Sequence, residues 1–301
     1  MIKGILKSFW KAIPLKVHLF TLLKSIWTPS PKIYQHLHFQ GIFSVNVEDK
    51  SFRVHHYGYE IENQIFWEGI TGRWEKISMQ LWIELCKHSA LILDVGANTG
   101  IYALVAKTAN PTAQVHAFEP LERIMEKLRR NCELNDFDII CDSTALSDST
   151  GEAVVYDTPT EHTYGVTVNE NHHDPGTKVI EVRIKTTSLA DYIESHRLQK
   201  IDLIKLDVER HEPEVLRGFG TYLRKMRPTL LIEILNDEKA EQIEEILTGL
   251  DYLFFEIDEI NPPKKVMHLN KHTGDNYMLP FSGGTNFLIC SEETAQLLRL
   301  V

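Results

Sequence analysis

The sequence predicts an α/β protein with a doubly wound, mostly parallel β-sheet and an amino-terminal helical and β-hairpin appendage. Two observations support this fold class. From residue 91 onward, short apolar runs typical of buried strands alternate with longer segments of helical spacing. Before residue 64 the pattern differs, with a basic segment of helical spacing followed by two β-rich runs. We therefore expect an appendage over residues 1–63 and a main domain over residues 64–301.

Composition limits the function classes. The chain has 301 residues, of which 43% are hydrophobic and 25% are charged, as expected for one large α/β domain with an appendage. Its formal net charge of −10 argues against a nucleic-acid-binding face, which needs a basic surface. The four cysteines form no Cys-x-x-Cys pair, which predicts reduced thiols and no zinc site. No apolar stretch reaches the roughly 18–20 residues that span a bilayer, so we expect a cytoplasmic protein.

The first 26 residues depart from this acidic average. They contain five lysines and no Asp or Glu, with apolar residues interleaved. They lack the unbroken apolar region and small-residue cleavage site of a secretory signal. The spacing predicts a basic amphipathic helix interrupted at Pro14. Such a helix either packs on its own domain or on a second copy in a homo-oligomer, or makes peripheral contact with an anionic membrane.

The remaining elements follow from local patterns. A linker is expected over 28–31, a hairpin over 42–47 and 51–57, and a helix within 68–88. Residues 152–187 interrupt the main alternation with two strands around a polar segment, which is either a substrate loop or a disordered tip. Ser188 then has the spacing of a helix cap. The expected strands of the main domain are 91–95, 114–118, 139–145, 201–208, 229–235, 252–257 and 286–290, and the expected helices are 101–109, 121–135, 213–226 and 239–250.

The segment after the first strand carries the strongest functional signal. Glycines let the backbone turn sharply and approach a ligand closely, and the amides of the following helix start form an anion site. A strand-end Asp suits an ammonium or sulfonium group and is awkward beside a pyrophosphate. The residues expected to bind a cofactor here are Asp94, Gly96, Asn98, Thr99 and Gly100.

The second and third strands add to this site. Glu119 follows the second strand, where an acidic residue accepts hydrogen bonds from ribose hydroxyls. Asp142 and Ser143 lie at the third strand, beside the expected adenine, although a solvated strand end is an equal alternative. The turn lacks the Gly-x-Gly-x-x-Gly spacing of a dinucleotide site. The combination favours S-adenosyl-L-methionine over NAD.

The fourth and fifth strands supply candidate catalytic groups. Asp207, Glu209 and His211 follow the fourth strand within five residues, and alternation places Asp207 and Glu209 on one side. Glu233 is a carboxylate in an otherwise apolar run, which predicts that it faces the same cleft. We expect Asp207, His211 and Glu233 to be catalytic, with His211 or Asp207 as the base. The alternative is an ion-paired loop around Lys205.

At this point the chain resembles the FkbM family of methyltransferases, over roughly residues 64–290. The resemblance implies a class I methyltransferase Rossmann-like fold and methyl transfer from S-adenosyl-L-methionine, usually to a hydroxyl of a sugar or a secondary metabolite. Arg210 departs from the family, which usually has Gly there, and Ala190 replaces an acid. The matching stretches are 94–102, 118–120, 145–148 with Gly151, 202–209, 211–212, 214–218, 227–228 and 232–234.

The sequence therefore predicts an O-methyltransferase that acts on a small-molecule or glycan acceptor, with no nucleic-acid partner and no metal ion. Asp207 and Glu233 could hold Mg²⁺, as carboxylates do in some methyltransferases. Two alternatives remain open. One is a non-catalytic protein that binds S-adenosyl-L-methionine, and the other is a membrane-surface adaptor that uses residues 1–26.

Overall fold

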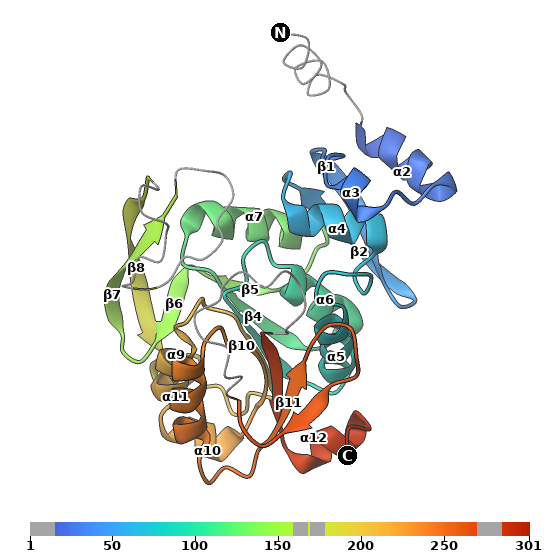
Figure 1. Cartoon of the computed structure of the whole chain (residues 1–301). Coiled ribbons are helices and arrows are strands. Elements are labelled where there is room, and N and C mark those ends of the chain that lie inside the picture. Colours follow the sequence, from blue (N-terminus) through green and yellow to red (C-terminus); the bar gives the residue numbers. More distant parts are fainter. Residues whose placement is uncertain (1–15, 159–167, 169–177, 270–284) are drawn as a thin grey trace. The chain divides into compact units, whose positions relative to one another are not determined.

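The structure is a computed structural model that describes residues 16–158, 168, 178–269 and 285–301 (Figure 1). The chain divides into two compact units, residues 1–74 and 75–301, which are described separately below. The division falls after Trp74, whereas the sequence pattern changes near residue 63. The predicted boundary falls inside helix α4, Glu60–Glu68, which lies wholly in the first unit.

The first unit is a β-hairpin covered by helices. The predicted hairpin is confirmed, with β1 (Gly41–Val47) antiparallel to β2 (Lys50–His56). Helix α2 (Lys16–Ile26) packs on β1, and α4 packs on both strands. The predicted linker over 28–31 is irregular up to Ser30, and Pro31 begins the short helix α3 (Pro31–Tyr34), because its fixed φ suits a first helical position.

Aromatic side chains form the core of this unit. Phe20 of α2 is 5.6 Å from the ring of Trp67, and Phe39 is 4.7 Å from the ring of Phe66 in an edge-on contact. Each of these rings is buried. Edge-on and tilted aromatic pairs contribute beyond the apolar area that they bury. The helices of this unit are therefore held on the hairpin mainly by ring packing.

The second unit contains an eight-stranded sheet in the order β12-β11-β13-β10-β9-β3-β4-β5. The five strands from β10 to β5 in this order are parallel, and β13 runs antiparallel between β10 and β11. The chain reverses its direction of strand addition between β3 and β9, which is the switch point where ligands bind in such sheets. The strands are β3 (Leu91–Val95), β4 (Gln114–Phe118), β5 (Ile140–Asp142), β9 (Leu203–Leu206), β10 (Thr229–Glu233), β11 (Leu253–Ile257), β12 (Lys264–Val266) and β13 (Asn286–Cys290).

Helices cover both faces of this sheet, as predicted (Figure 1). Leu93, Ile204 and Leu230 belong to one buried cluster with side chains of α8 to α11. Because side chains alternate along a strand, Asp94 and Lys205 point to the opposite face, which α5 and α6 cover. The helices are α5 (Lys76–Lys87), α6 (Ile101–Ala109), α7 (Glu122–Glu133), α8 (Leu189–His196), α9 (Glu212–Gly218), α10 (Thr221–Met226), α11 (Asp237–Leu247) and α12 (Glu292–Leu297).

The predicted third strand over 139–145 was wrong as a single element. It divides into β5 and β6 (Thr144–Ser147), which belong to different sheets. The chain leaves the large sheet at Ser143, where the Thr144 hydroxyl donates to Asp142 Oδ1 at 2.8 Å. β6 then pairs with β8 (Ile180–Ser188), and β7 (Gly151–Asp157) completes a separate three-stranded sheet.

Two predicted helices also begin or divide differently. The helix expected within 68–88 is α5 alone, and the helix expected over 213–226 divides into α9 and α10 at Gly220, whose φ is +54°. The predicted cap is confirmed, because Ser188 Oγ accepts a hydrogen bond from the Asp191 amide at 3.0 Å. The polar segment that was expected to be either a substrate loop or a disordered tip lies mainly in 159–167 and 169–177, outside the described residues.

Gly96 is the position where two central strands approach most closely. Its φ is +82°, and a Cβ atom there would lie 1.8 Å from the backbone oxygen of Asp207. The Asp207 amide in turn donates to the Val95 carbonyl at 3.0 Å. A side chain at residue 96 would therefore separate the end of β3 from the end of β9.

We expect Gly96→Ala to lower the unfolding temperature far more than Gly249→Ala. Gly249 also has a positive φ, +72°, but the nearest heavy atom to its added Cβ would be 3.8 Å away, at Arg224. Gly249→Ala therefore carries only the left-handed strain of about 1–2 kcal/mol, whereas Gly96→Ala adds a backbone collision. Thermal unfolding followed by circular dichroism measures both, and equal losses would contradict the assigned close approach.

Candidate active site

The candidate site lies along the carboxyl ends of the parallel strands. The ladder aligns Ile232, Leu206, Val95, Phe118 and Asp142 in one row across five neighbouring strands. The next residue on each strand therefore lies just beyond the sheet edge. These residues are, in spatial order, Glu233, Asp207, Gly96, Glu119 and Ser143.

Glu119 joins the end of β4 to the turn after β3. Its Oε2 accepts from the Asn98 amide at 3.2 Å, and its Oε1 accepts from the Leu121 amide at 3.0 Å. Burial raises the pKa of Glu119 to about 7, although these backbone donors oppose the rise. A carboxylate has about four acceptor positions, so two remain for a ligand.

The turn between β3 and α6 is held in a strained backbone conformation. Asn98 has a φ of +49° and Gly100 a φ of +89°. The Thr99 carbonyl accepts from the Asn131 side chain at 2.8 Å, and a Cβ at Gly100 would lie 2.9 Å from the Leu128 side chain. The structure therefore packs this turn tightly against α7 and leaves Asn98 half-buried.

Asp94 lies one residue before the end of β3. Its side chain is buried, and Oδ2 accepts from the Ala103 amide in the first turn of α6 at 2.9 Å. Burial raises the pKa of Asp94 to about 7. Asp94 thus holds the first turn of α6 in place, and this contact helps to fix the turn that precedes the helix.

Asp142 and Ser143 are both half-buried at the end of β5. The Asp142 carbonyl accepts from the Glu119 amide at 3.2 Å, and the Ser143 hydroxyl accepts from Arg129 at 2.8 Å. The backbone of Asp142 therefore ties the third strand end to Glu119. The Ser143 side chain is therefore hydrogen-bonded to a residue of α7.

Lys205 is a buried cation at the centre of the acidic side of the site. Its Nζ is 3.1 Å from Asp207 Oδ2 and 5.0 Å from the ring centroid of Tyr102. The Tyr102 hydroxyl donates to Glu75, which immediately precedes α5. Burial alone would lower the pKa of Lys205, but Asp207, Glu75 and Glu233 together raise it above its ordinary value. Sequence analysis assigned no functional role to Glu75 or Tyr102.

Three carboxylates gather beside this cation. Asp207, Glu209 and Glu233 each offer an oxygen within 4.8 Å of the others. Burial, followed by the charges of Asp207 and Glu209, raises the pKa of Glu233 well above its ordinary range. Glu233 also accepts from the Thr285 hydroxyl at 2.9 Å. These three residues could hold a divalent cation, and Lys205 already supplies one positive charge at Asp207.

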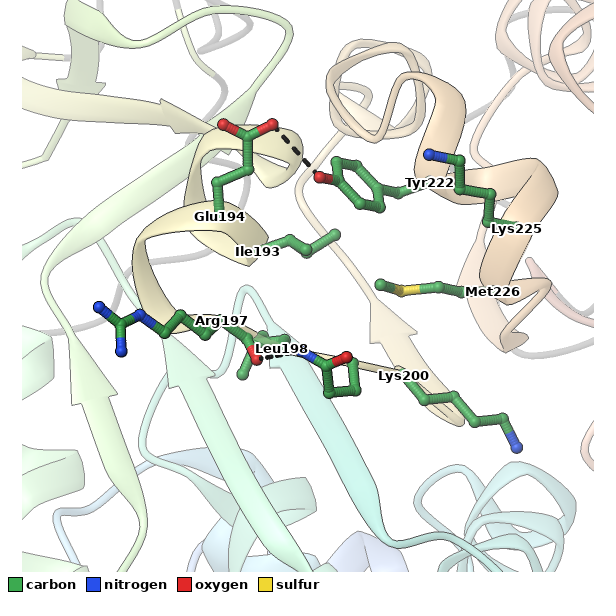
Figure 2. A pocket seen from close by; sticks show the side chains of 9 residues that line it. Ile193, Glu194, Arg197, Leu198, Lys200, Tyr222, Lys225 and Met226 are labelled. Atoms are coloured by element: carbon green, nitrogen blue, oxygen red, sulfur yellow. Dashed lines mark hydrogen bonds between the residues drawn. The ribbon is translucent and has the colours of Figure 1, made fainter.

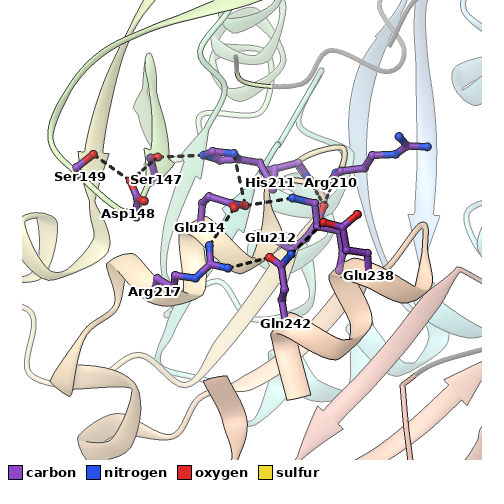
Figure 3. Close-up of polar contacts among 12 residues, drawn as sticks. Ser147, Asp148, Ser149, Arg210, His211, Glu212, Glu214, Arg217, Glu238 and Gln242 are labelled. Carbon is purple, nitrogen blue, oxygen red and sulfur yellow. Dashed lines mark hydrogen bonds and ion pairs between the residues drawn. The ribbon is translucent and has the colours of Figure 1, made fainter. Parts of the chain in front are cut away.

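His211 is not part of this carboxylate group among the described residues, and Figure 3 shows it with its own partners. Its Nε2 is 3.0 Å from the Ser147 hydroxyl, and its Nδ1 is 3.7 Å from a Glu214 carboxylate oxygen. The backbone turns through positive φ at Glu209 and Arg210, +53° and +78°. This turn carries His211 away from the end of β9 and toward β6.

Glu212 holds the loop between β9 and α9 in place (Figure 3). Its Oε1 accepts from the amides of Val208 and Arg210 at 3.2 and 3.1 Å. The side chain is fully buried, its Oε2 has no hydrogen-bond partner among the described residues, and burial raises its pKa to about 8. These contacts fix the loop that carries Asp207.

A hollow of about 550 Å³ lies elsewhere in this unit, between α8 and α10 (Figure 2). Both helices end just before β9 and β10 begin, so the hollow lies toward the amino ends of the strands. Parallel sheets bind ligands at the opposite edge. Its lining residues are Ile193, Glu194, Arg197, Leu198, Gln199, Lys200, Tyr222, Lys225 and Met226.

A model of a known protein family covers the strand ends described above. A model of the methyltransferase FkbM domain matches residues 94–257, more than half of the chain, and spans the strand ends from Asp94 to Glu233. The chain belongs to the FkbM methyltransferase family. The fold class expected from the family resemblance is thereby confirmed, a class I methyltransferase sheet with the switch point at β3 and β9.

Methyltransferases from several organisms are similar to this chain. The chain is 28% identical over 192 residues to the hexuronic acid methyltransferase AglP of Haloferax volcanii, covering 63% of this chain and 74% of that protein. It is 28% identical over 152 residues to the 31-O-demethyl-FK506 methyltransferase FkbM of Streptomyces tacrolimicus, covering 42% of this chain and 58% of that protein.

Among solved structures, the methyltransferase FkbM from Methylobacillus flagellatus KT matches with 17% identity and a TM-score of 0.40. The match covers 67% of this chain and 43% of that structure. This similarity is low, so the family assignment rests on the sequence match. Within the described part of this FkbM-family chain, no helix is long and apolar enough to cross a membrane.

We expect Glu212→Gln to change the pH dependence of stability with a definite sign. The folded protein holds the Glu212 proton up to about pH 8, whereas the unfolded chain releases it near its ordinary pKa of 4.5. Wild-type stability therefore falls as pH rises between these values. Glutamine keeps the oxygen that accepts from Val208 and Arg210, and it has no proton to lose.

The measurement is the difference in unfolding temperature between Glu212→Gln and wild type. It should become more positive from pH 5 to pH 8. Glu238→Gln is the control, because Glu238 is exposed on α11 and should show no such trend. A difference that stays constant across this range would contradict a protonated Glu212.

Proposed function

We propose that this FkbM-family protein transfers a methyl group from S-adenosyl-L-methionine to a hydroxyl of a sugar or another hydroxylated metabolite. One observation carries this proposal. Five strand ends place Glu119, the Gly96 turn and Asp207 in one row along the carboxyl edge of the sheet. A ribose-binding acid and a candidate proton acceptor therefore flank the same turn.

The donor side of the site fits the nucleoside part of this cofactor. Glu119 keeps acceptor positions for ribose hydroxyls while backbone amides of Asn98 and Leu121 hold its side chain in place. Asp142 lies on the next strand, at the distance of one strand spacing, where its carboxylate faces a base bound beside the ribose. S-adenosyl-L-methionine supplies a methyl group that its sulfonium already activates, so alignment of the acceptor is the main task of the protein.

The acceptor side is the acidic group around Asp207. Lys205 holds Asp207 Oδ2 at 3.1 Å, and Oδ1 has no hydrogen-bond partner among the described residues. That oxygen can orient an acceptor hydroxyl and take its proton. Glu233, whose pKa is raised by burial and by the charges of Asp207 and Glu209, can hydrogen-bond a second oxygen of the acceptor. A sugar offers such neighbouring oxygens.

His211 is proposed to act as a positioning residue. Its ring links the start of α9 to Ser147 of β6 at 3.0 Å, and a Cβ at Gly218 of the same helix would lie 1.9 Å from the Ser147 carbonyl. The imidazole therefore helps to hold α9 against the small sheet. Of the two candidate bases, His211 and Asp207, we therefore propose Asp207.

The acceptor class is supported by the relatives. AglP is a methyltransferase for a hexuronic acid, and FkbM acts on 31-O-demethyl-FK506, as their names state. Both names describe small or glycan acceptors. We extend this chemistry to the present chain and leave the individual acceptor to a substrate panel.

We expect Glu119→Ala to weaken S-adenosyl-L-methionine binding by roughly 1.5–3 kcal/mol, the scale of a hydrogen bond to a charged partner. Glu126→Ala is the matched control, because Glu126 lies on α7 with an exposed side chain. Isothermal titration calorimetry measures both variants, and thermal unfolding confirms that each is folded. The donor assignment fails if a folded Glu119→Ala binds the cofactor as tightly as the control.

A second pair of variants separates chemistry from packing. Asp207→Asn should lower the single-turnover methyl-transfer rate by about 10²–10⁴ while cofactor affinity stays within a few-fold. His211→Ala should lower the unfolding temperature and reduce the rate much less. Release of S-adenosylhomocysteine is followed with a panel of uronic acids, glycans and polyol metabolites. Wild-type rates in Asp207→Asn would rule out Asp207 as the base, and a larger kinetic loss in His211→Ala would restore His211.

A further inference from the structure

Helix α2 of the first unit has apolar residues on two of its faces. Phe20 is buried against Phe39 and Trp67, and α2 packs on β1 along this side. Leu22 and Ile26, four residues apart on the other side, are 65% and 78% exposed. A helix that is apolar on opposite faces is normally covered on both. The second face of α2 therefore needs an apolar partner.

Further exposed apolar side chains continue this surface. Leu19 lies three residues before Leu22 on the same face of the helix, and Trp27 follows its end. Ile33 of the adjoining α3 is also exposed. We call Leu19, Leu22, Ile26 and Trp27 the α2 surface. Contiguous exposed apolar residues with an aromatic at one end are typical of helices that lie in a membrane interface.

The charge distribution indicates what the α2 surface meets. Residues 1–47 contain six lysines and no Asp or Glu, whereas residues 48–301 carry a net charge of −16. An anionic surface attracts the first segment and repels the rest of the chain within roughly a Debye length of 8–10 Å. This segregation orients the protein with the α2 surface toward the anionic side.

We propose that the α2 surface docks on an anionic lipid bilayer. The apolar side chains insert into the interface, and the lysines are attracted to acidic headgroups. Stable attachment generally requires two such contributions. A nucleic acid would match the lysines and leave the apolar row in water. This proposal does not depend on the proposed methyl donor or acceptor, since its test involves neither.

The test is sedimentation of the full-length protein with phosphatidylcholine vesicles, with and without phosphatidylglycerol. We expect binding to the acidic vesicles alone, weakened at high salt. The double substitution Leu22→Ser with Ile26→Ser should lower partitioning at least about tenfold, and Ile260→Ser should not change it. Ile260 is the matched control, because it is 69% exposed and lies in the second unit. Lys32→Gln should lower partitioning about fivefold, the scale of one basic residue at a membrane, and Lys185→Gln should have no effect.

Unfolding temperature and mass distinguish the other occupants of the α2 surface. If lipid covers it, the double variant in solution should unfold at the wild-type temperature or higher, because two exposed apolar groups have become polar. A marked loss of stability would show that another part of the protein covers these residues. A dimer in sedimentation velocity that the double variant converts to monomer would show a contact between copies. Either result, or failure of the intact protein to bind acidic vesicles, overturns the proposal.

Discussion

The buried ammonium of Lys205 is the charge on which the acidic side of the site depends. Asp207, Glu75 and Glu233 could not gather near one strand end without a cation, because like charges in a buried place raise one another's pKa and favour protonation. Lys205 offsets this repulsion through a 3.1 Å contact with Asp207 while the ring of Tyr102 covers it. The position of Lys205 inside β9 therefore lets Asp207 and Glu233 lie at neighbouring strand ends, where burial and the nearby carboxylates raise the pKa of Glu233.

The strand ends act together because the central strands approach so closely. Gly96 lies against the Asp207 backbone, and the Gly96 and Ala97 amides both donate to the Phe118 carbonyl, at 3.0 and 2.9 Å. These contacts leave little freedom between the turn after β3 and the ends of β4 and β9. A site built on such rigid elements keeps its donor and acceptor sides in fixed relation, which is what alignment of a methyl transfer requires.

Local patterns predicted the large sheet well, because each of its central strands is a short apolar run bounded by Gly, Asp or Glu. β3, α6, β4 and β13 have the predicted limits. Patterns failed where tertiary pairing decides. Nothing local indicates that Ser143 ends one sheet and begins another, or that Glu259 would cap α5 from far along the chain by accepting from the Ile77 and Ser78 amides. His211 was placed near Asp207 by sequence distance, whereas two left-handed residues between them redirect the backbone. Glu75 belongs to no recognisable sequence motif, and its place beside the site is evident only from its contact with Tyr102.

The small sheet is fixed to α7 at one end of its hairpin. Asp157 of β7 pairs with Ile180 of β8, and Val155 of β7 also pairs with Val168, which lies between Asp157 and Ile180 in the chain. Arg123 of α7 donates two hydrogen bonds to the Asp157 carboxylate, at 2.8 and 2.6 Å. These bonds fix the end of β7 to the helix that follows Glu119. Loop-closure cost rises slowly with length. Added chain length between Asp157 and Ile180 would therefore cost little free energy of loop closure, while the Arg123 contact keeps the end of β7 on α7.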